Sequence, residues 1–106
     1  MASLRGGGTV SRCIYKYPLA LSGSTQFYVR GGRFLSVALD GRGMPCAYFE
    51  VEADDYEVAE RQEYFVGYFT GSGISEVEDG PYVFVGTVNA EGIVTHYYRY
   101  QGRWSR

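Results

Sequence analysis

The sequence predicts a mainly β protein: a single small antiparallel β-sandwich or barrel of about seven strands, with one short helix or acidic loop. Two observations predict this fold class. The dominant hydrophobic period along the chain is two, and turn residues separate the alternating runs. The length of 106 residues suits one domain. We place that domain at residues 12–100, between a flexible N-terminal leader (1–11) and a polar C-terminal tail (101–106).

The first two expected strands lie in the N-terminal third of the chain. Apolar and polar residues alternate over residues 13–17 until Pro18 ends the run. A second run at residues 27–29 alternates in the same way before Gly31 and Gly32 turn the chain. Both runs are therefore expected to be strands.

A β-hairpin is expected next. Leu35, Val37 and Leu39 are spaced two apart, which predicts that they share one face of a third strand. Residues 40–43, Asp-Gly-Arg-Gly, supply turn chemistry before a fourth strand through residues 47–51. The third and fourth strands are expected to pair.

An acidic segment interrupts the strand pattern. Residues 52–63 carry six carboxylates and one arginine, with no turn glycine or proline inside, so a short helix or a long acidic connection fits better than a strand. Residues 64–69 then alternate as a fifth strand, and a glycine-rich loop follows at residues 70–73.

The last two strands are expected at residues 82–88 and 93–100, joined by an Asn-Ala-Glu-Gly turn at residues 89–92 as a second hairpin. Aromatic residues occupy both faces of residues 64–69 and 97–100. One face of a small antiparallel sheet normally meets water, so a second aromatic face favours self-association into a homo-oligomer. Tyrosine also tolerates exposure through its hydroxyl, which is the simpler alternative.

Basic side chains are segregated along the chain, and nine of the ten are arginine. Residues 1–42 carry six positive charges and one negative, residues 43–92 carry one positive and eleven negative, and residues 93–106 add three positive charges. Arginine presents a planar fork that matches phosphate and carboxylate oxygens and also stacks on aromatic rings. This pattern favours binding of a small anionic, planar ligand.

Several broad classes of protein are disfavoured. The net charge of -2 and the pI near 5.3 argue against general nucleic-acid binding, which depends on neutralising phosphates. No apolar run approaches the roughly 20 residues of a membrane span. Residues 1–10 lack the apolar segment of a signal peptide, so we expect a cytoplasmic protein without membrane contact.

The sequence contains few groups suited to catalysis. Cys13 and Cys46 are expected to be reduced, buried and inert, with a disulfide between them as the alternative. The lone His96 is expected to be an exposed or hydrogen-bonded structural residue, with a general-base role as the alternative. No nucleophile elbow, phosphate loop or zinc spacing is present, so we expect no enzyme and no cofactor.

Acidic clusters are the only candidate metal ligands. Asp54 and Asp55 form one cluster, and Glu76, Glu78 and Asp79 form another. Such carboxylates can hold a divalent cation, but acidic loops on a protein surface commonly face solvent. We therefore expect no metal.

Several motifs resemble a family of small proteins of unassigned function in bacteriophage genomes, over roughly residues 13–100. The motifs are Ile14-Tyr15-Lys16-Tyr17-Pro18-Leu19, Phe34-Leu35-Ser36-Val37, Gly43-Met44-Pro45-Cys46-Ala47-Tyr48, Thr70-Gly71-Ser72-Gly73-Ile74, and Tyr82-Val83-Phe84-Val85-Gly86-Thr87-Val88 leading to His96. In that family the glycine loop usually reads Thr-Gly-His-Pro-Ile. Ser72 and Gly73 replace the His-Pro here, so no role of that histidine transfers to this chain.

The resemblance implies a phage protein made in the host cytoplasm. The chain is similar in size and general character to small phage proteins, called sponges, that sequester the cyclic nucleotide or cyclic ADP-ribose signals of Thoeris and related immune systems. Such a protein needs a pocket, aromatic faces for a base, and arginines or backbone N–H groups for phosphates, but no catalytic residues. We therefore expect non-catalytic capture of a nucleotide-type immune signal, which blocks host anti-phage defence.

Candidate ligand-binding groups fall into three kinds, which we expect to converge on one cavity. A backbone nest is expected at Gly71, Ser72 and Gly73. We expect phosphate oxygens to be bound by Arg33, Arg42 and Arg99, with Arg99 the strongest candidate because it lies among aromatic residues. Base stacking is expected on Tyr68, Phe69, Tyr97 or Tyr98.

Two further functions stay open. The protein can be an inhibitor or decoy that binds a basic host protein through acidic residues 52–63. It can also be a minor virion component that assembles through its β-edges. Both are protein-protein interaction modules, in contrast to a ligand-binding protein.

Overall fold

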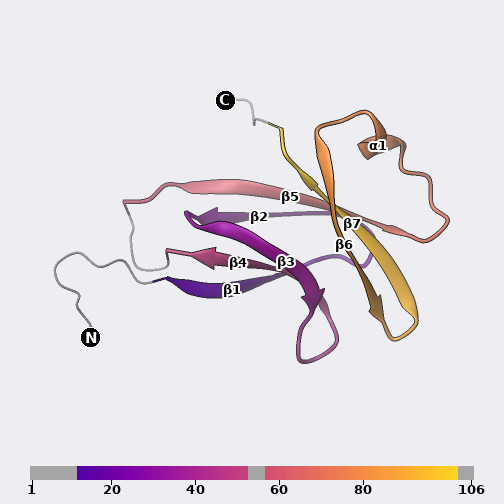
Figure 1. Ribbon diagram of the computed structural model, residues 1–106, viewed down its shortest axis with the longest axis horizontal. Helices are drawn as coiled ribbons and strands as arrows, with labels where there is room; N and C mark the ends of the chain where they lie inside the picture. Colours follow the sequence, from indigo (N-terminus) through magenta and orange to yellow (C-terminus); the bar gives the residue numbers. More distant parts are fainter. Residues whose placement is uncertain (1–11, 53–56, 103–106) are drawn as a thin grey trace.

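The computed structural model describes residues 12–52 and 57–102, and it confirms a mainly β, sandwich-like fold (Figure 1). A three-stranded antiparallel sheet has the order β1 (Cys13–Pro18), β4 (Pro45–Val51), β3 (Arg33–Leu39). A four-stranded antiparallel sheet has the order β2 (Gly23–Arg30), β5 (Glu60–Phe69), β7 (Ile93–Tyr100), β6 (Tyr82–Ala90). A four-residue helix, α1 (Ser75–Glu78), lies between β5 and β6. The leader and residues 103–106 of the tail lie outside the described residues.

Both predicted hairpins are confirmed. In the β3–β4 turn, Oδ1 of Asp40 accepts hydrogen bonds from the backbone N–H groups of Arg42, at 2.9 Å, and Met44, at 3.0 Å. In the β6–β7 turn, Oδ1 of Asn89 accepts the N–H of Gly92 at 2.7 Å. Because these short polar side chains bond to backbone only a few residues away, the turns form from local sequence.

Aromatic side chains make the core between the sheets. Phe49 of β4 and Phe65 of β5 are fully buried and meet edge to face, with ring centroids 6.2 Å apart. Tyr17 of β1 stacks on Phe27 of β2 at 4.5 Å. These contacts join residues from opposite sheets, and the buried area of the rings supplies much of the driving force for folding.

The predicted face of the third strand is wrong at one position. The register between β3 and β4 shifts between Phe34 and Ser36, so Leu35 is an extra residue in a β-bulge. A bulge adds one residue to a strand, so the side chains before and after it no longer alternate in step between the two faces of the sheet. Phe34, instead of Leu35, therefore joins Val37 against the core, and the side chain of Leu35 is exposed.

The prediction for residues 52–63 is also wrong in part, because β5 begins at Glu60. Residues 60–63 pair with β2, and Arg30 lies opposite Glu60 with Nη2 and Oε2 3.4 Å apart. This long-range pairing overrides the acidic composition, which taken alone disfavours a strand. The helix lies instead at α1, after β5, and residues 53–56 lie outside the described part of the chain.

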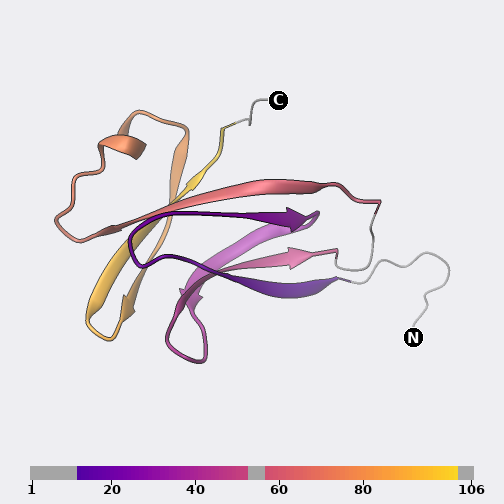
Figure 2. The same cartoon turned by 180° about the vertical axis from the view of Figure 1, so that it is seen from behind.

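The two sides of the sandwich differ. On one side β3 and β6 approach closely, and Gly86 of β6 packs against Val37 of β3. On the other side, seen in Figure 2, the edge strands β1 and β2 do not approach each other in the same way. The sole lysine, Lys16, lies on β1, and Pro18 ends that strand; both residue types discourage edge-to-edge pairing.

Three connections meet at one end of the sandwich, which we call the turn end: residues 19–22, 40–44 and 91–92, with Thr70 beside the last of them. Backbone and side-chain hydrogen bonds hold the first of them in place. The N–H of Leu19 donates to Pro45 O at 3.0 Å, and the hydroxyl of Thr95 donates to Leu21 O at 2.8 Å. Loops that converge at one end of a rigid sandwich are a common place for binding sites.

Candidate functional site

Two neighbouring recesses open at the turn end. The larger has a volume of about 600 Å³ and is lined by Phe69, Thr70, Gly92, Ile93 and Val94. The smaller, of about 230 Å³, is lined by Leu21, Arg42, Gly43, Met44, Ala90, Glu91 and Ile93. Ile93 forms a wall of both, so the two recesses adjoin. The larger volume falls within the roughly 300–1,000 Å³ of small-molecule sites.

Arg42 is the basic side chain of the turn end. Among the described residues, every other lysine or arginine has a carboxylate partner; the pairs are Arg12 with Glu50 and Glu52, Lys16 with Asp40, Arg30 with Glu60, Arg33 with Glu50, and Arg61 and Arg99 with Glu63. The guanidinium of Arg42 forms no ion pair with any residue that the structure describes, although Glu91 lines the same recess. Of the cations in residues 12–52 and 57–102, Arg42 is therefore the one without a carboxylate partner to displace.

His96 lies beside the turn end and bonds through both ring nitrogens. Its Nε2 is 2.7 Å from Oγ1 of Thr70, and its Nδ1 is 2.9 Å from Oγ1 of Thr87. The expected hydrogen bonding of this histidine is therefore confirmed. Because Thr70 also lines the larger recess, the imidazole fixes the position of the Thr70 hydroxyl at the wall of that recess.

The predicted backbone nest does not form as expected. The N–H of Ser72 donates to Phe69 O at 3.0 Å and closes a turn, so it is not available to an anion. Gly71 adopts φ +93°, a left-handed conformation suited to glycine, within this turn. Gly71, Ser72 and Gly73 follow Phe69 and Thr70 closely in the chain but line neither recess.

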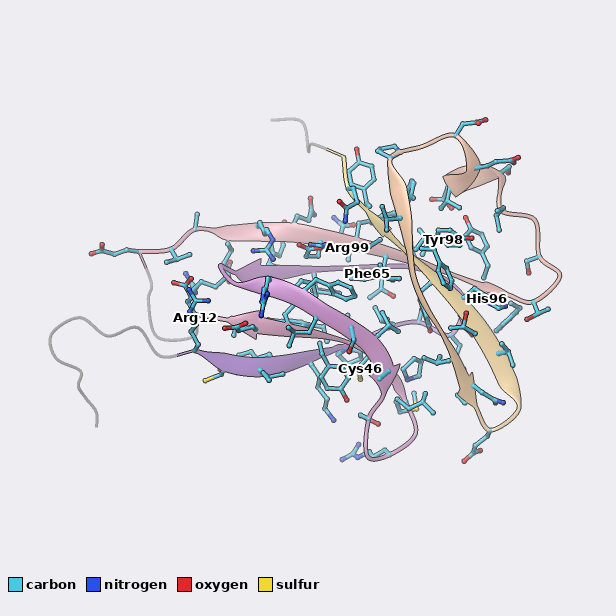
Figure 3. The ribbon with its side chains drawn as sticks, in the orientation of Figure 1. Arg12, Cys46, Phe65, His96, Tyr98 and Arg99 are labelled. Carbon is cyan, nitrogen blue, oxygen red and sulfur yellow. The ribbon has the colours of Figure 1, made fainter. Side chains whose placement is uncertain are left out.

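The predicted arginines do not share a cavity, which corrects our expectation of convergence. Arg33 extends from the outer face of the three-stranded sheet, with its Nε 3.1 Å from Oε1 of Glu50 and its side chain 75% exposed. Arg99 lies at the other end of β7 from the turn end, beside Phe65 (Figure 3). The strand register separates these side chains: Arg33 lies opposite its partner Glu50 in the three-stranded sheet, whereas Arg99 lies opposite Phe65 in the four-stranded sheet and pairs with Glu63 of the same sheet.

Arg99 is instead part of a partly buried ion cluster around the buried carboxylate of Glu63. Its Nε and Nη2 donate to the two carboxylate oxygens of Glu63 at 2.9 and 3.0 Å, and its guanidinium lies 5.1 Å from the ring centroid of Phe34. Nε of Arg61 donates to the same carboxylate at 2.8 Å. Sequence reasoning missed Arg61 and Glu63, since nothing local links them to a residue 36 positions away.

The four predicted stacking residues lie in three different places. Phe69 lines the larger recess. Tyr97 is 1% exposed in the core and donates its hydroxyl to Ala20 O, so it cannot stack on a ligand in this structure. Tyr68 and Tyr98 meet edge to face at 6.0 Å on the outer face of the four-stranded sheet, where the hydroxyl of Tyr68 donates to Glu76.

The recess also contains residues that sequence reasoning did not select, notably Thr70, Glu91 and Ile93. The predicted topology could have pointed to these residues, because the hairpin turns at residues 40–43 and 89–92 lie on the same side of a meander. Of the predicted set, Phe69 lines the larger recess and Arg42 the smaller one that adjoins it, whereas Gly71, Ser72 and Gly73 line neither.

The cysteines are both free, as expected, but only one is buried. Cys46 is buried, and burial raises the pKa of its thiol. Cys13 is exposed at the start of the edge strand β1, which corrects the expectation that both are buried. Strand alternation alone did not reveal that β1 lies at an open edge.

Metal-binding clusters and membrane-spanning helices are both absent from the described residues. Over residues 12–52 and 57–102, no three His, Cys, Asp or Glu side chains gather as a metal-binding group. The candidate ligands Asp54 and Asp55 lie outside those residues. Within the same ranges, no helix has the length and apolar character needed to cross a membrane.

The fold and the recesses define a small antiparallel β-sandwich with a ligand-sized opening between its turns. The family model for a domain of unknown function (DUF7352) matches residues 10–105, so the chain belongs to this family. No curated protein and no solved structure matches the chain.

Proposed function

We propose that this protein is a non-catalytic binding protein that captures a small anionic, nucleotide-like molecule at the turn end. One observation carries the proposal: Arg42 forms no ion pair with any described residue and lines a recess that adjoins a larger one containing Phe69. An arginine without an internal partner retains its donors for phosphate oxygens. The neighbouring aromatic ring offers a surface for a base.

Each wall of the two recesses has a role in this proposal. Arg42 binds the phosphate, Phe69 stacks on the base, and the hydroxyl of Thr70 bonds to a sugar or base edge. Ile93 and Met44 provide apolar contact and exclude water.

The biological setting follows from the resemblance to small phage proteins. We propose that the protein acts in the cytoplasm of an infected host and sequesters an immune signal, such as a cyclic nucleotide or a cyclic ADP-ribose isomer. Capture in a stoichiometric complex lowers the free concentration of the signal and blocks anti-phage defence. It requires a tight site and sufficient protein, but no turnover.

The test is a thermal-shift screen against cyclic dinucleotides, cyclic trinucleotides and cyclic ADP-ribose isomers. A ligand that binds only the folded state raises the melting temperature by mass action. We expect at least one to do so for the wild type and for Arg33→Gln, and to have little effect on Arg42→Gln. Arg33→Gln is the matched control, because it removes the same charge from an exposed site elsewhere.

Two results would contradict the proposal. One is a shift of equal size in Arg42→Gln and the wild type; the other is the absence of any shift across the panel. Mass spectrometry of the ligand released by heating checks the non-catalytic claim. A sequestering protein returns the molecule intact, whereas an enzyme returns a product.

A second candidate is a protein-protein interaction module that includes a homo-oligomer. It is favoured by large side chains exposed along the open side and on the outer faces: Ile14 is 66%, Tyr28 59% and Phe84 53% exposed. Exposed aromatic and aliphatic side chains of this kind are common where proteins bind one another. Analytical ultracentrifugation of the full chain separates the alternatives, because a monomer at high concentration contradicts the oligomer.

A further inference from the structure

The cluster of Arg61, Glu63 and Arg99 has an unbalanced charge. Two guanidinium groups share one carboxylate, and Glu63 is 4% exposed. The recess beside the cluster has a volume of about 220 Å³ and is lined by Arg61, Gln62, Glu63, Arg99, Tyr100, Gln101 and Gly102. Glu63 is the single carboxylate in that lining, so the recess carries one net positive charge.

Both arginines also retain donors. Arg61 uses Nε for Glu63 and Nη1 for Gly31 O, at 2.8 and 2.7 Å. Arg99 uses Nε and Nη2 for Glu63. Within the described chain, Nη2 of Arg61 and Nη1 of Arg99 have no hydrogen-bond partner, and each of these nitrogens carries two N–H groups.

The guanidinium groups are held in place before any ligand arrives. Arg99 lies 5.1 Å from the ring centroid of Phe34 and 5.8 Å from that of Phe49, and Arg61 lies 5.8 Å from the same Phe49 ring. Rings below and a carboxylate beside them restrict the side chains, so an anion binds without ordering them first. Partial burial also reduces screening of the charge by salt.

We propose that this recess is a second, separate oxyanion site, which binds one phosphate or carboxylate group between Arg61 and Arg99. Its volume suits one such group and is too small for a whole nucleotide. The site lies at the other end of β7 from the turn end. It does not depend on the function proposed for Arg42.

The experiment titrates the full-length protein with inorganic phosphate and, separately, with acetate at equal ionic strength. The readout is the side-chain Nε–H resonances of Arg61 and Arg99 in ¹⁵N correlation spectra, together with the dissociation constant. We expect saturable shifts of both resonances. The stronger of the two anions identifies whether phosphate or carboxylate is the preferred group.

Variants make the assignment specific. Arg61→Gln leaves Glu63 paired with Arg99 and is expected to weaken binding at least about tenfold, the effect of one charge-assisted hydrogen bond. Glu63→Gln raises the net charge of the recess and is expected to tighten binding. Arg33→Gln, which removes the same charge as Arg61→Gln from another face, is expected to leave the dissociation constant unchanged.

Three outcomes would overturn the proposal. The first is that neither anion produces a saturable shift of the two resonances. The second is equal weakening by Arg61→Gln and Arg33→Gln, which would reveal a general charge effect. The third applies if Glu63→Gln folds, as judged by circular dichroism, and binds more weakly than the wild type. If Glu63→Gln does not fold, the comparison of Arg61→Gln with Arg33→Gln decides.

Discussion

Arg99 and Glu63 form a two-pronged ion pair between neighbouring strands, with Nε 2.9 Å from Oε1 and Nη2 3.0 Å from Oε2. The Glu63 side chain is 5% exposed and the Arg99 side chain 21% exposed. The pair therefore lies mostly out of water, where a carboxylate without a partner is costly. It connects the end of β7 to the ring of Phe34 in the opposite sheet.

Removal of Arg99 is expected to destabilise the fold. Arg99→Ala leaves the buried Glu63 carboxylate with Arg61 alone, and breaking a buried pair typically costs about 3–5 kcal/mol. Arg61 partly compensates, so we expect the free energy of unfolding to fall by about 2–4 kcal/mol. Urea denaturation monitored by circular dichroism measures the change.

The control for that prediction is Arg33→Ala, which breaks an exposed pair with Glu50. Exposed pairs contribute about 0–1 kcal/mol, so this variant should unfold close to the wild type. Equal unfolding midpoints for Arg99→Ala and Arg33→Ala would show that burial of the cluster does not matter for stability.

Gly32 is expected to be intolerant of any side chain. It adopts φ +70°, and a Cβ atom there would collide with the backbone carbonyl of Glu50 in β4. Gly43, at φ +81°, has open space around the same position. Gly43→Ala is therefore destabilised only by the cost of placing alanine in the left-handed conformation, about 1–2 kcal/mol. Gly32→Ala must in addition displace a central strand.

The measurement for this glycine pair is soluble yield followed by thermal denaturation. We expect Gly43→Ala to fold with a lowered melting temperature and Gly32→Ala to lose the cooperative transition. A Gly32→Ala protein that melts cooperatively near Gly43→Ala would mean that β4 can shift at little cost.

Alkaline pH is expected to destabilise the protein through Tyr97. Burial raises the pKa of Tyr97 to about 12, from an ordinary value near 10. A raised pKa means that the folded state holds the proton more tightly than the unfolded state, so the stability is complete below pH 10. It is lost progressively as pH rises from about 10 to about 12.

Tyr97→Phe removes this ionisation, together with the hydrogen bond to Ala20 O. We expect the variant to be about 1 kcal/mol less stable at pH 7 but to lose less stability between pH 9 and pH 11. Urea midpoints across that range test the slope. Burial also raises the pKa values of Tyr17 and Tyr82, so a smaller dependence of stability on pH is expected to persist in the variant. A pH dependence equal to that of the wild type would exclude Tyr97 as its main source.

The two thiols are expected to differ in reactivity. Cys13 is exposed, whereas Cys46 is buried and burial raises the pKa of its thiol, which lowers the thiolate population. Ellman's reagent should therefore label one thiol per chain in the native state and two after denaturation. Cys13→Ser should abolish the native reaction. Fast labelling of that variant would show that Cys46 is accessible.

Local sequence accounts for the strands and for both hairpin turns. The turns depend on Asp40 and Asn89, whose side chains bond to backbone within four residues, so both turns can be recognised from the sequence alone. Strand alternation is likewise a local pattern. The residue types of the candidate site, arginine and phenylalanine beside glycine-rich turns, were recognisable for the same reason.

Tertiary structure decided which of these groups meet. The pairing of β5 with β2 made residues 60–63 a strand despite their acidity, and the bulge at Leu35 moved Phe34 into the core. The same registers brought Arg99 to Glu63 and left Arg42 without an ion pair at the turn end, among the residues described. These outcomes depend on contacts between residues far apart in the chain, whose energies arise only when the two sheets pack together, whereas turns and alternation need only neighbouring residues.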